Sequence, residues 1–153
     1  MTEDIDAIVK RLQDAIFAGY SPKLKEELFN AANIGAIDKP DSRVRITGVC
    51  GDTIEMFLSV RDAKVHDIQF VTDGCGFTVA CANYVARTAI GKSIEEAMRI
   101  EQDEVDRYFE GLPEENKHCA KLAVMTLHAL LEQYRSRSNP EKYRDAGAEK
   151  KPL

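Results

Sequence analysis

The first thirty positions of the chain show apolar residues at helical spacing. Apolar positions three or four residues apart over residues 4–17 predict an amphipathic helix, and they are Ile5, Ile8, Leu12 and Ile16. Gly19 ends this pattern, and Ser21 followed by Pro22 favours the N-cap and first position of a second helix. Residues 30–41 contain glycine and proline, so we expect a loop there.

From Val44 onward apolar and polar residues alternate, which is the period of a β-strand. Val44 and Ile46 belong to a first short strand. The inward positions of a second strand are Ile54, Met56, Leu58 and Val60. A third strand is expected over residues 64–72, with Ile68 and Phe70 inward. Because only short turns separate the three segments, they predict an antiparallel meander with one packed face.

Helical spacing returns after Gly76 and continues to Gly91. Ser93 and Glu96 form a capping-box pattern, which predicts a short helix. Another short helix is expected over residues 103–109, and a last, longer one over residues 117–135. The apolar side of the last helix is expected to contain Ala120, Val124, Leu127, Leu131 and Tyr134.

Size and composition indicate one globular domain. The chain has 153 residues, 44% of them apolar and 31% charged, which is ordinary for a protein with a buried core. We assign residues 1–135 to this single domain. Residues 136–153 are charged and poor in apolar groups, so we expect a mobile C-terminal tail.

Charge and hydropathy exclude two classes of partner. A net charge of −5 argues against a nucleic-acid binder, because binding phosphates needs a basic surface. No apolar run approaches the roughly 20 residues that span a bilayer, so no membrane partner is expected. The N-terminus lacks a signal-peptide pattern, which predicts a cytoplasmic protein. The four cysteines are then expected to be reduced thiols rather than disulfides.

Three distant segments place a cysteine beside glycine or histidine at the edge of a predicted element. Cys50 and Asp52 stand two apart at the expected start of a strand, so their side chains would share a face. Cys75 stands where a strand gives way to a helix, and Cys119 follows His118 in the first turn of the last helix. Thiolate, carboxylate and imidazole are groups that hold iron or zinc.

Cys75 and Cys119 share a favourable electrostatic position. The free N–H groups and positive dipole end of a helix N-terminus favour a thiolate, so we expect a lowered pKa for Cys119. Cys81 lies on the apolar stripe of its helix and is interpreted as a small buried hydrophobe. The sequence has no Cys-x-x-Cys pair, and spacing alone leaves open a set of scattered buried thiols.

Several short motifs occur in an order that strongly resembles the IscU/NifU-type iron–sulfur cluster assembly scaffolds. They run from Phe29-Asn30 to Tyr134 and include Gly48-Val49-Cys50-Gly51-Asp52, Gly74-Cys75-Gly76-Phe77-Thr78-Val79-Ala80, Gly91-Lys92-Ser93 and His118-Cys119-Ala120. The resemblance implies an α+β fold of the IscU/NifU N-terminal type. This fold has a three-stranded antiparallel sheet packed by several helices, a long C-terminal helix, and cysteines clustered at one exposed end.

The resemblance also implies a function. A cysteine desulfurase would deliver persulfide sulfur, iron would arrive separately, and a labile [2Fe–2S] cluster would be built and passed to acceptor apoproteins. The chain would be a scaffold and not an enzyme. By position, Cys50, Cys75 and Cys119 would bind the cluster, with Cys119 the sulfur acceptor. Asp52 would tune cluster lability, and the fourth ligand is left open between Asp52 and His118.

Two alternative functions remain open, and the sequence differs from the family pattern at one motif. Zinc could replace the cluster in a sulfur-transfer protein of the same fold, and a thiol–disulfide redox protein is a second alternative. Where many bacterial members have a Leu-Pro-Pro-Val-Lys chaperone-recognition run, this chain has Leu112-Pro113-Glu114-Glu115-Asn116, which argues against chaperone-assisted release by that route. A second subunit could shield an exposed cluster, so a homodimer is left open.

Overall fold

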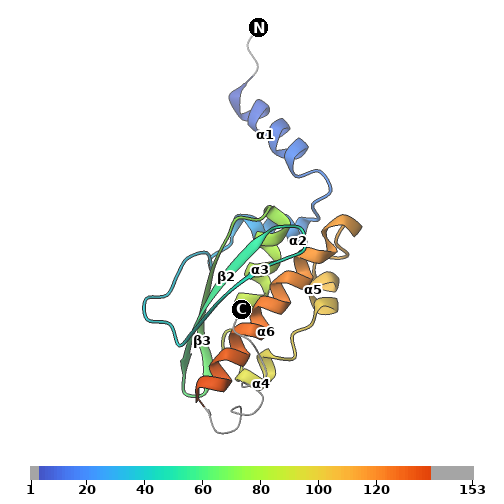
Figure 1. Ribbon diagram of the computed structural model, residues 1–153. Helices are drawn as coiled ribbons and strands as arrows, with labels where there is room; N and C mark the ends of the chain where they lie inside the picture. The colour runs from blue at the N-terminus through green and yellow to red at the C-terminus, as the bar shows by residue number, and fades with distance from the viewer. Residues whose placement is uncertain (1–3, 139–153) are drawn as a thin grey trace.

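The computed structural model describes residues 4–138 and contains one antiparallel sheet (Figure 1). Its strands are β1 (Ser42–Thr47), β2 (Thr53–Arg61) and β3 (Lys64–Thr72), in the order β1-β2-β3. Both neighbouring pairs are antiparallel, with Val44 opposite Met56 and Met56 opposite Phe70. The meander predicted from the alternating pattern is therefore confirmed.

Helices precede and follow the sheet. They are α1 (Ile5–Ile16), α2 (Pro22–Phe29), α3 (Gly76–Ala89), α4 (Ile94–Ala97), α5 (Gln102–Tyr108), the 3-10 helix η1 (Glu114–Asn116) and α6 (Lys117–Ser138). Helix α6 continues three residues past its predicted end, and the rest of the predicted tail lies outside the described residues. Within residues 4–138, no helix combines the length and apolarity needed to cross a bilayer.

Local side-chain contacts explain where two of the helices begin. Ser21 accepts a hydrogen bond from the backbone N–H of Leu24, and Pro22 occupies the first turn of α2. Ser93 and Glu96 form the predicted capping box at the start of α4. These caps satisfy N–H groups that a helix leaves unpaired at its first turn.

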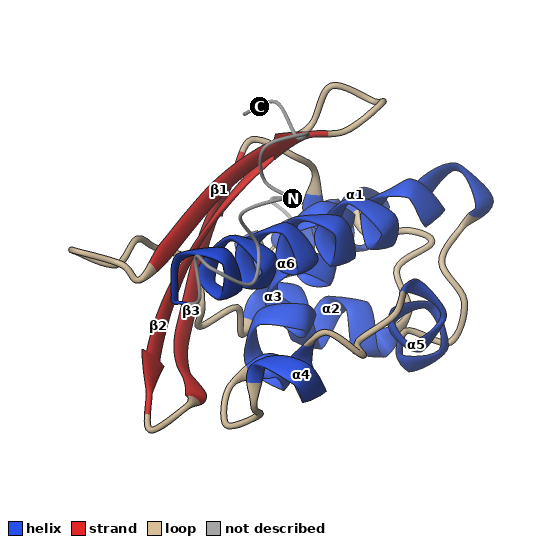
Figure 2. Cartoon of the chain, turned by 60° about the horizontal axis from the view of Figure 1, so that its bottom comes forward, coloured by secondary structure: helices blue, strands red, loops and turns tan. Residues whose placement is uncertain are grey.

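Helices α3 and α6 pack against one face of the sheet, as the two layers in Figure 2 show. The contact is apolar, because alternate residues of β2 and β3 meet the apolar sides of both helices. Among the fully buried side chains at its centre are Ile54, Met56, Leu58, Ile68, Phe70, Val85, Leu127, Leu130 and Leu131. This core fixes the N-terminal ends of α3 and α6 relative to the sheet.

An ion pair between the buried carboxylate of Glu27 and the partly exposed Arg87 holds α2 against α3. Glu27 is 6% exposed, and its carboxylate accepts hydrogen bonds from Arg87 Nε and Nη2 at 2.7–3.0 Å. Asn83 donates a further bond to the same carboxylate. A buried carboxylate needs such partners to offset its lost hydration. The pair therefore fixes how α2 lies along the helix that begins beside Cys75.

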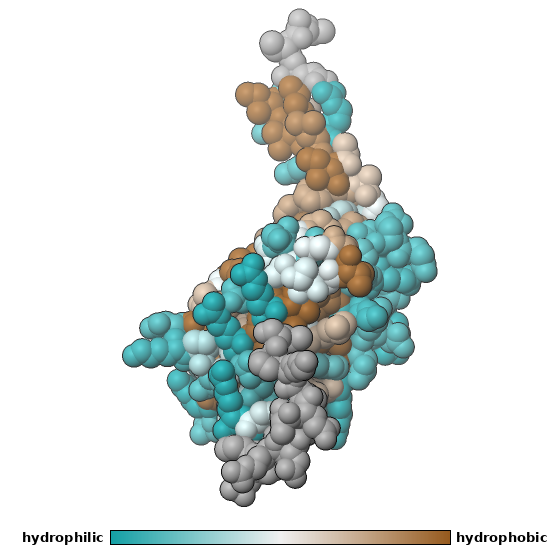
Figure 3. All heavy atoms as spheres, in the orientation of Figure 1, coloured by the Kyte–Doolittle hydropathy of each residue, from teal (hydrophilic) through white to brown (hydrophobic). Residues whose placement is uncertain are grey.

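Helix α1 stands away from this two-layer body (Figure 1). Its amphipathic pattern is the predicted one, but none of its residues is buried, and Ile5 is 74% and Ile16 67% exposed. Figure 3 shows the resulting apolar surface on this helix as a brown patch at the top of the view. The pattern correctly predicted the helix, and no described part of the chain covers its apolar side.

Candidate metal centre

The loop between β1 and β2 contains Cys50 and Asp52. We expected both residues at the start of a strand, and this is wrong, because β2 begins at Thr53 and the two residues lie in the turn before it. The turn is closed by a hydrogen bond from Gly48 N to the Asp52 carbonyl oxygen at 2.8 Å. Gly51 has φ +91°, a conformation that glycine adopts without a Cβ penalty. The tight turn, and not a strand pleat, brings Cys50 and Asp52 together.

Cys75 lies at the N-cap of α3, as predicted, at the end of the segment that follows β3. This segment is tied to the start of β2, since Asp73 Oδ1 accepts a hydrogen bond from Thr53 N at 2.8 Å. Thr72 Oγ1 donates to the Thr53 carbonyl oxygen at 2.6 Å. Asp52 precedes Thr53 directly, so these bonds bring Asp52 and Cys75 into one neighbourhood.

His118 and Cys119 lie in the first turn of α6, which packs against both the sheet and α3. The His118 Nε2 atom is 3.7 Å from the Cys119 sulfur. Cys119 is 1% exposed and His118 is half-buried. Cys119 therefore lies at the buried end of the site, and His118 lies closer to the surface.

The structure brings all five predicted residues together as two groups that share Asp52. The ligand atoms of Asp52, Cys75 and Cys119 lie within 4.8 Å of one another, and so do those of Cys50, Asp52 and His118. Two sulfurs bound to one tetrahedral metal at about 2.3 Å would be roughly 3.8 Å apart. Small side-chain movements are thus enough to close either group around a metal ion.

Exposure differs strongly among the cysteines. Cys50 and Cys75 are exposed, whereas Cys119 is buried. Burial is the main cause that raises the pKa of the Cys119 thiol to about 11; the hydrogen bond from Thr78 lowers this pKa, and the nearby Cys75 sulfur raises it. The lowered pKa expected for Cys119 is therefore wrong, because loss of hydration outweighs the helix dipole.

The chain matches a known protein family over most of its length. The family described as "NifU-like N terminal domain" matches residues 19–141. The chain belongs to this family. The match begins after α1 and covers the sheet, both cysteine-bearing helices and all five candidate site residues.

Curated relatives of this NifU-like chain extend over most of its length. It is 34% identical over 133 residues to "Iron-sulfur cluster assembly scaffold protein IscU 1" of Archaeoglobus fulgidus, covering 86% of this chain and 87% of that protein. It is 33% identical over 124 residues to "Iron-sulfur cluster assembly scaffold protein IscU" of Haemophilus influenzae, covering 77% and 97%.

A solved structure confirms the α+β fold of this NifU-like chain. The N-terminal part of a nitrogen-fixing NifU-like protein from Brucella abortus superposes with a TM-score of 0.66, covering 79% of this chain and 97% of that one. At 21% identity this likeness shows the fold alone. The three-stranded sheet, the packed helices and the long C-terminal helix agree with the prediction.

The remaining cysteine and histidines of this NifU-like chain lie outside both groups. Cys81 is fully buried, as predicted, and burial raises the pKa of its thiol well above the usual value. His66 is exposed on β3, and His128 Nε2 lies 2.8 Å from the Ile100 carbonyl oxygen. None of the three joins a potential ligand group among the described residues.

Sequence analysis missed Thr78, whose side chain contacts Asp52, Cys75 and Cys119. Its hydroxyl is fully buried and hydrogen-bonds to Asp52 Oδ2 at 3.0 Å. It also lies 3.4 Å from the Cys119 sulfur. The signal was present, because residues three apart on a helix share a face and Thr78 follows Cys75 by three.

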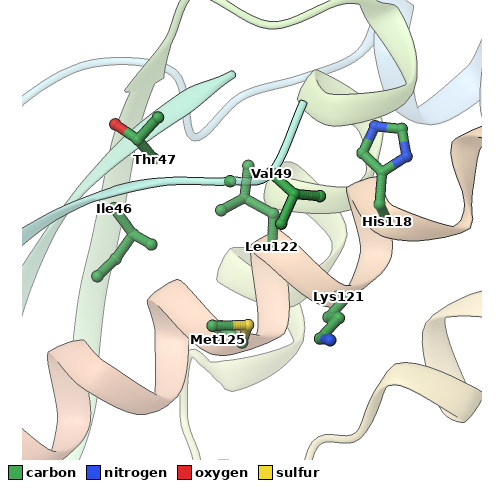
Figure 4. Close-up of a pocket in the computed structure, with 8 residues that line it drawn as sticks. Ile46, Thr47, Val49, His118, Lys121, Leu122 and Met125 are labelled. Carbon is green, nitrogen blue, oxygen red and sulfur yellow. The ribbon is translucent and has the colours of Figure 1, made fainter. Parts of the chain in front are cut away.

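An apolar pocket adjoins the site between the β1–β2 loop and α6 (Figure 4). Val49, Leu122 and Met125 line it, and His118 stands at its rim. Val49 is 99% exposed and Met125 is 50% exposed. Cys50, next to Val49, therefore sits at the edge of an open surface that a partner can reach.

The rate at which each cysteine is alkylated should decrease with the burial of its thiol. At pH 8 we expect iodoacetamide to modify Cys50 and Cys75 at least about tenfold faster than Cys119, because the thiolate is the reactive form and Cys119 is both buried and protonated. Since the raised pKa leaves less thiolate at every pH below 11, the Cys119 rate should keep rising toward pH 11. Peptide mass spectrometry at timed intervals measures this order. Equal rates at pH 8 would contradict the buried position.

Proposed function

We propose that this chain is a scaffold on which a [2Fe–2S] cluster is assembled from iron and sulfide and from which the cluster is then transferred. The observation that supports this most strongly is the convergence of Asp52, Cys75 and Cys119, with Cys50 and His118 beside them. Thiolates are the usual ligands of iron–sulfur clusters. The cluster is cargo in this role, so the chain needs no resident cofactor and acts as a carrier, not as an enzyme.

The mixture of ligand types suits temporary binding. Iron in these clusters prefers soft thiolates, and a carboxylate is a harder ligand that holds it less firmly. Cys50 and Cys75 are exposed, so acceptor proteins can approach one side of the cluster. We assign Cys50, Cys75 and Cys119 as ligands, with Asp52 as the fourth and His118 as its alternative.

Sulfur would come from a cysteine desulfurase. In the proposed step the Cys119 thiolate attacks the outer sulfur of the desulfurase persulfide, a new S–S bond forms on Cys119, and the desulfurase cysteine leaves as a thiolate. Two electrons from an external donor then reduce the transferred sulfur to sulfide. Because Cys119 is 1% exposed, docking of the desulfurase must first open the site around it.

The relatives' names support acceptor apoproteins as partners, and the state of the cysteines supports a cytoplasmic location. Two relatives are named as iron–sulfur cluster assembly scaffolds, which fits acceptor apoproteins as the receiving partners. All four cysteines are free, as expected in the cytoplasm, which is the compartment we propose. A second copy of the chain could shield the exposed cysteines, and no nucleic acid or membrane is needed.

Anaerobic reconstitution tests this function. The full chain is incubated with ferrous iron, cysteine, a cysteine desulfurase and a thiol reductant, then desalted. We expect visible charge-transfer bands and equal amounts of iron and sulfide, with native mass spectrometry giving the cluster content and the oligomeric state. A colourless protein that retains only zinc would favour zinc-dependent sulfur transfer. A reversible disulfide between Cys75 and Cys119 without metal would favour the redox alternative.

A further inference from the structure

The hydroxyl of Thr78 touches every member of the Asp52, Cys75 and Cys119 group. Thr78 Oγ1 lies 3.0 Å from Asp52 Oδ2, 3.4 Å from the Cys119 sulfur and 3.8 Å from the Cys75 sulfur. The side chain is fully buried on α3, so its hydroxyl meets these groups in place of water. A buried hydroxyl surrounded by potential metal ligands is well placed to orient them.

Local structure explains why Thr78 can reach so far. It lies one helical turn after Cys75, which puts both side chains on the same face of α3. Gly74 packs directly over it, and a Cβ on Gly74 would lie 2.7 Å from Thr78 Cβ. That separation is far below normal contact, so the absence of a side chain at Gly74 leaves the space that Thr78 fills.

Asp52 is the ligand candidate that most needs to be held. It lies in the turn before β2, where no strand ladder fixes its side chain, and it is half-buried. A hydroxyl has one proton to donate, and the closer acceptor is Asp52 Oδ2. Donation to one carboxylate oxygen leaves the other oxygen free to bind metal. Hydrogen bonds of this kind orient a carboxylate ligand, and their loss lowers the metal affinity of the site.

We propose that Thr78 is a positioning residue that holds the Asp52 carboxylate toward Cys75 and Cys119 and thereby sets the metal affinity of the site. This inference rests on the proposed function of these residues as a metal centre. It predicts that the hydroxyl acts through Asp52, so its contribution should vanish when Asp52 is absent.

The test uses Zn²⁺ as the probe, in competition with a chromophoric chelator under anaerobic reducing conditions. Thr78→Val keeps the shape of the side chain and removes the hydroxyl, and Thr78→Ser keeps the hydroxyl. We expect Thr78→Val to weaken Zn²⁺ binding about 10- to 100-fold. Thr78→Ser should stay within about threefold of the wild-type affinity. In an Asp52→Ala background, adding Thr78→Val should change the affinity by less than about twofold.

The outcomes separate this inference from the proposed function. Wild-type protein that binds Zn²⁺ while Thr78→Val binds equally well would overturn the role of Thr78 and leave the metal centre standing. An undiminished effect of Thr78→Val in the Asp52→Ala background would also overturn it, because the loss would then be general disruption. Failure of the wild-type protein to bind Zn²⁺ would overturn both. If far-UV circular dichroism shows that Thr78→Val does not fold, Thr78→Ala provides the same comparison without the added methyl group.

Discussion

Cys119→Ser is expected to lose nearly all cluster binding and all sulfur acceptance. Structural zinc in a four-ligand site contributes about 10–16 kcal/mol, so one thiolate accounts for roughly 3 kcal/mol, more than a hundredfold in affinity. The serine hydroxyl fits the buried space but is neither a soft ligand nor a sulfur nucleophile. Iron and sulfide analysis after reconstitution gives the binding. Mass spectrometry of the chain after desulfurase turnover gives the sulfur loading.

The matched control for this variant is Cys81→Ala. Cys81 is also a buried cysteine, on α3 instead of α6, and it lies outside both groups of candidate ligands in residues 4–138. It should reconstitute to the wild-type level. Full sulfur loading of Cys119→Ser would refute the assignment of Cys119 as acceptor, and loss of the cluster in Cys81→Ala would extend the site to a fourth thiol.

Asp52→Ala is expected to slow the loss of a bound cluster by on the order of tenfold, which corresponds to about 1.4 kcal/mol in the barrier. The carboxylate is the hardest of the candidate ligands and shares its position with two softer groups. Cys50 and His118 both have ligand atoms within 4.8 Å of it. When the carboxylate is absent, the softer imidazole of His118 can take its place and slow the release of iron to an acceptor. The decay of visible absorption in the presence of an apo-acceptor or chelator measures the rate.

Two further variants identify the cause of that slowing. Asp52→Asn keeps the side chain's size and removes its charge, so it should resemble Asp52→Ala if the carboxylate makes the cluster labile. Asp52→Ala combined with His118→Ala removes a replacement ligand and should lose the cluster faster than Asp52→Ala alone. Faster loss in Asp52→Ala itself would show that the carboxylate stabilises the cluster.

The sheet was predictable from the sequence, because alternation of apolar residues in β2 and β3 directly encodes one buried face. The candidate site residues follow from ordered motifs, since the spacing of Cys50, Cys75 and Cys119 alone does not say that they meet. Their meeting depends on the Thr53–Asp73 hydrogen bond and on the packing of α6, which are contacts across 20 or more residues.

The properties of individual site residues were harder to predict. The pKa of Cys119 depends on how deeply the packed helices bury its sulfur, and a helix-terminus argument contains no information about depth. The period-two rule placed Cys50 and Asp52 on a strand, although Gly48 and Gly51 in fact form a turn there. Thr78 went unnoticed because a threonine on a helix has many ordinary roles, and only its contact with Asp52 distinguishes it.

Because the first helix is exposed, we expect it to unfold separately from the body of the chain. An isolated helix of 12 residues is only marginally stable in water, and α1 has no buried residue to add tertiary stabilisation. Its amide hydrogens should therefore exchange with solvent through local fraying, whereas those of β2 exchange only when the whole body opens. A denaturation experiment that follows far-UV ellipticity will combine these two events, whereas amide exchange of β2 will report on the body alone.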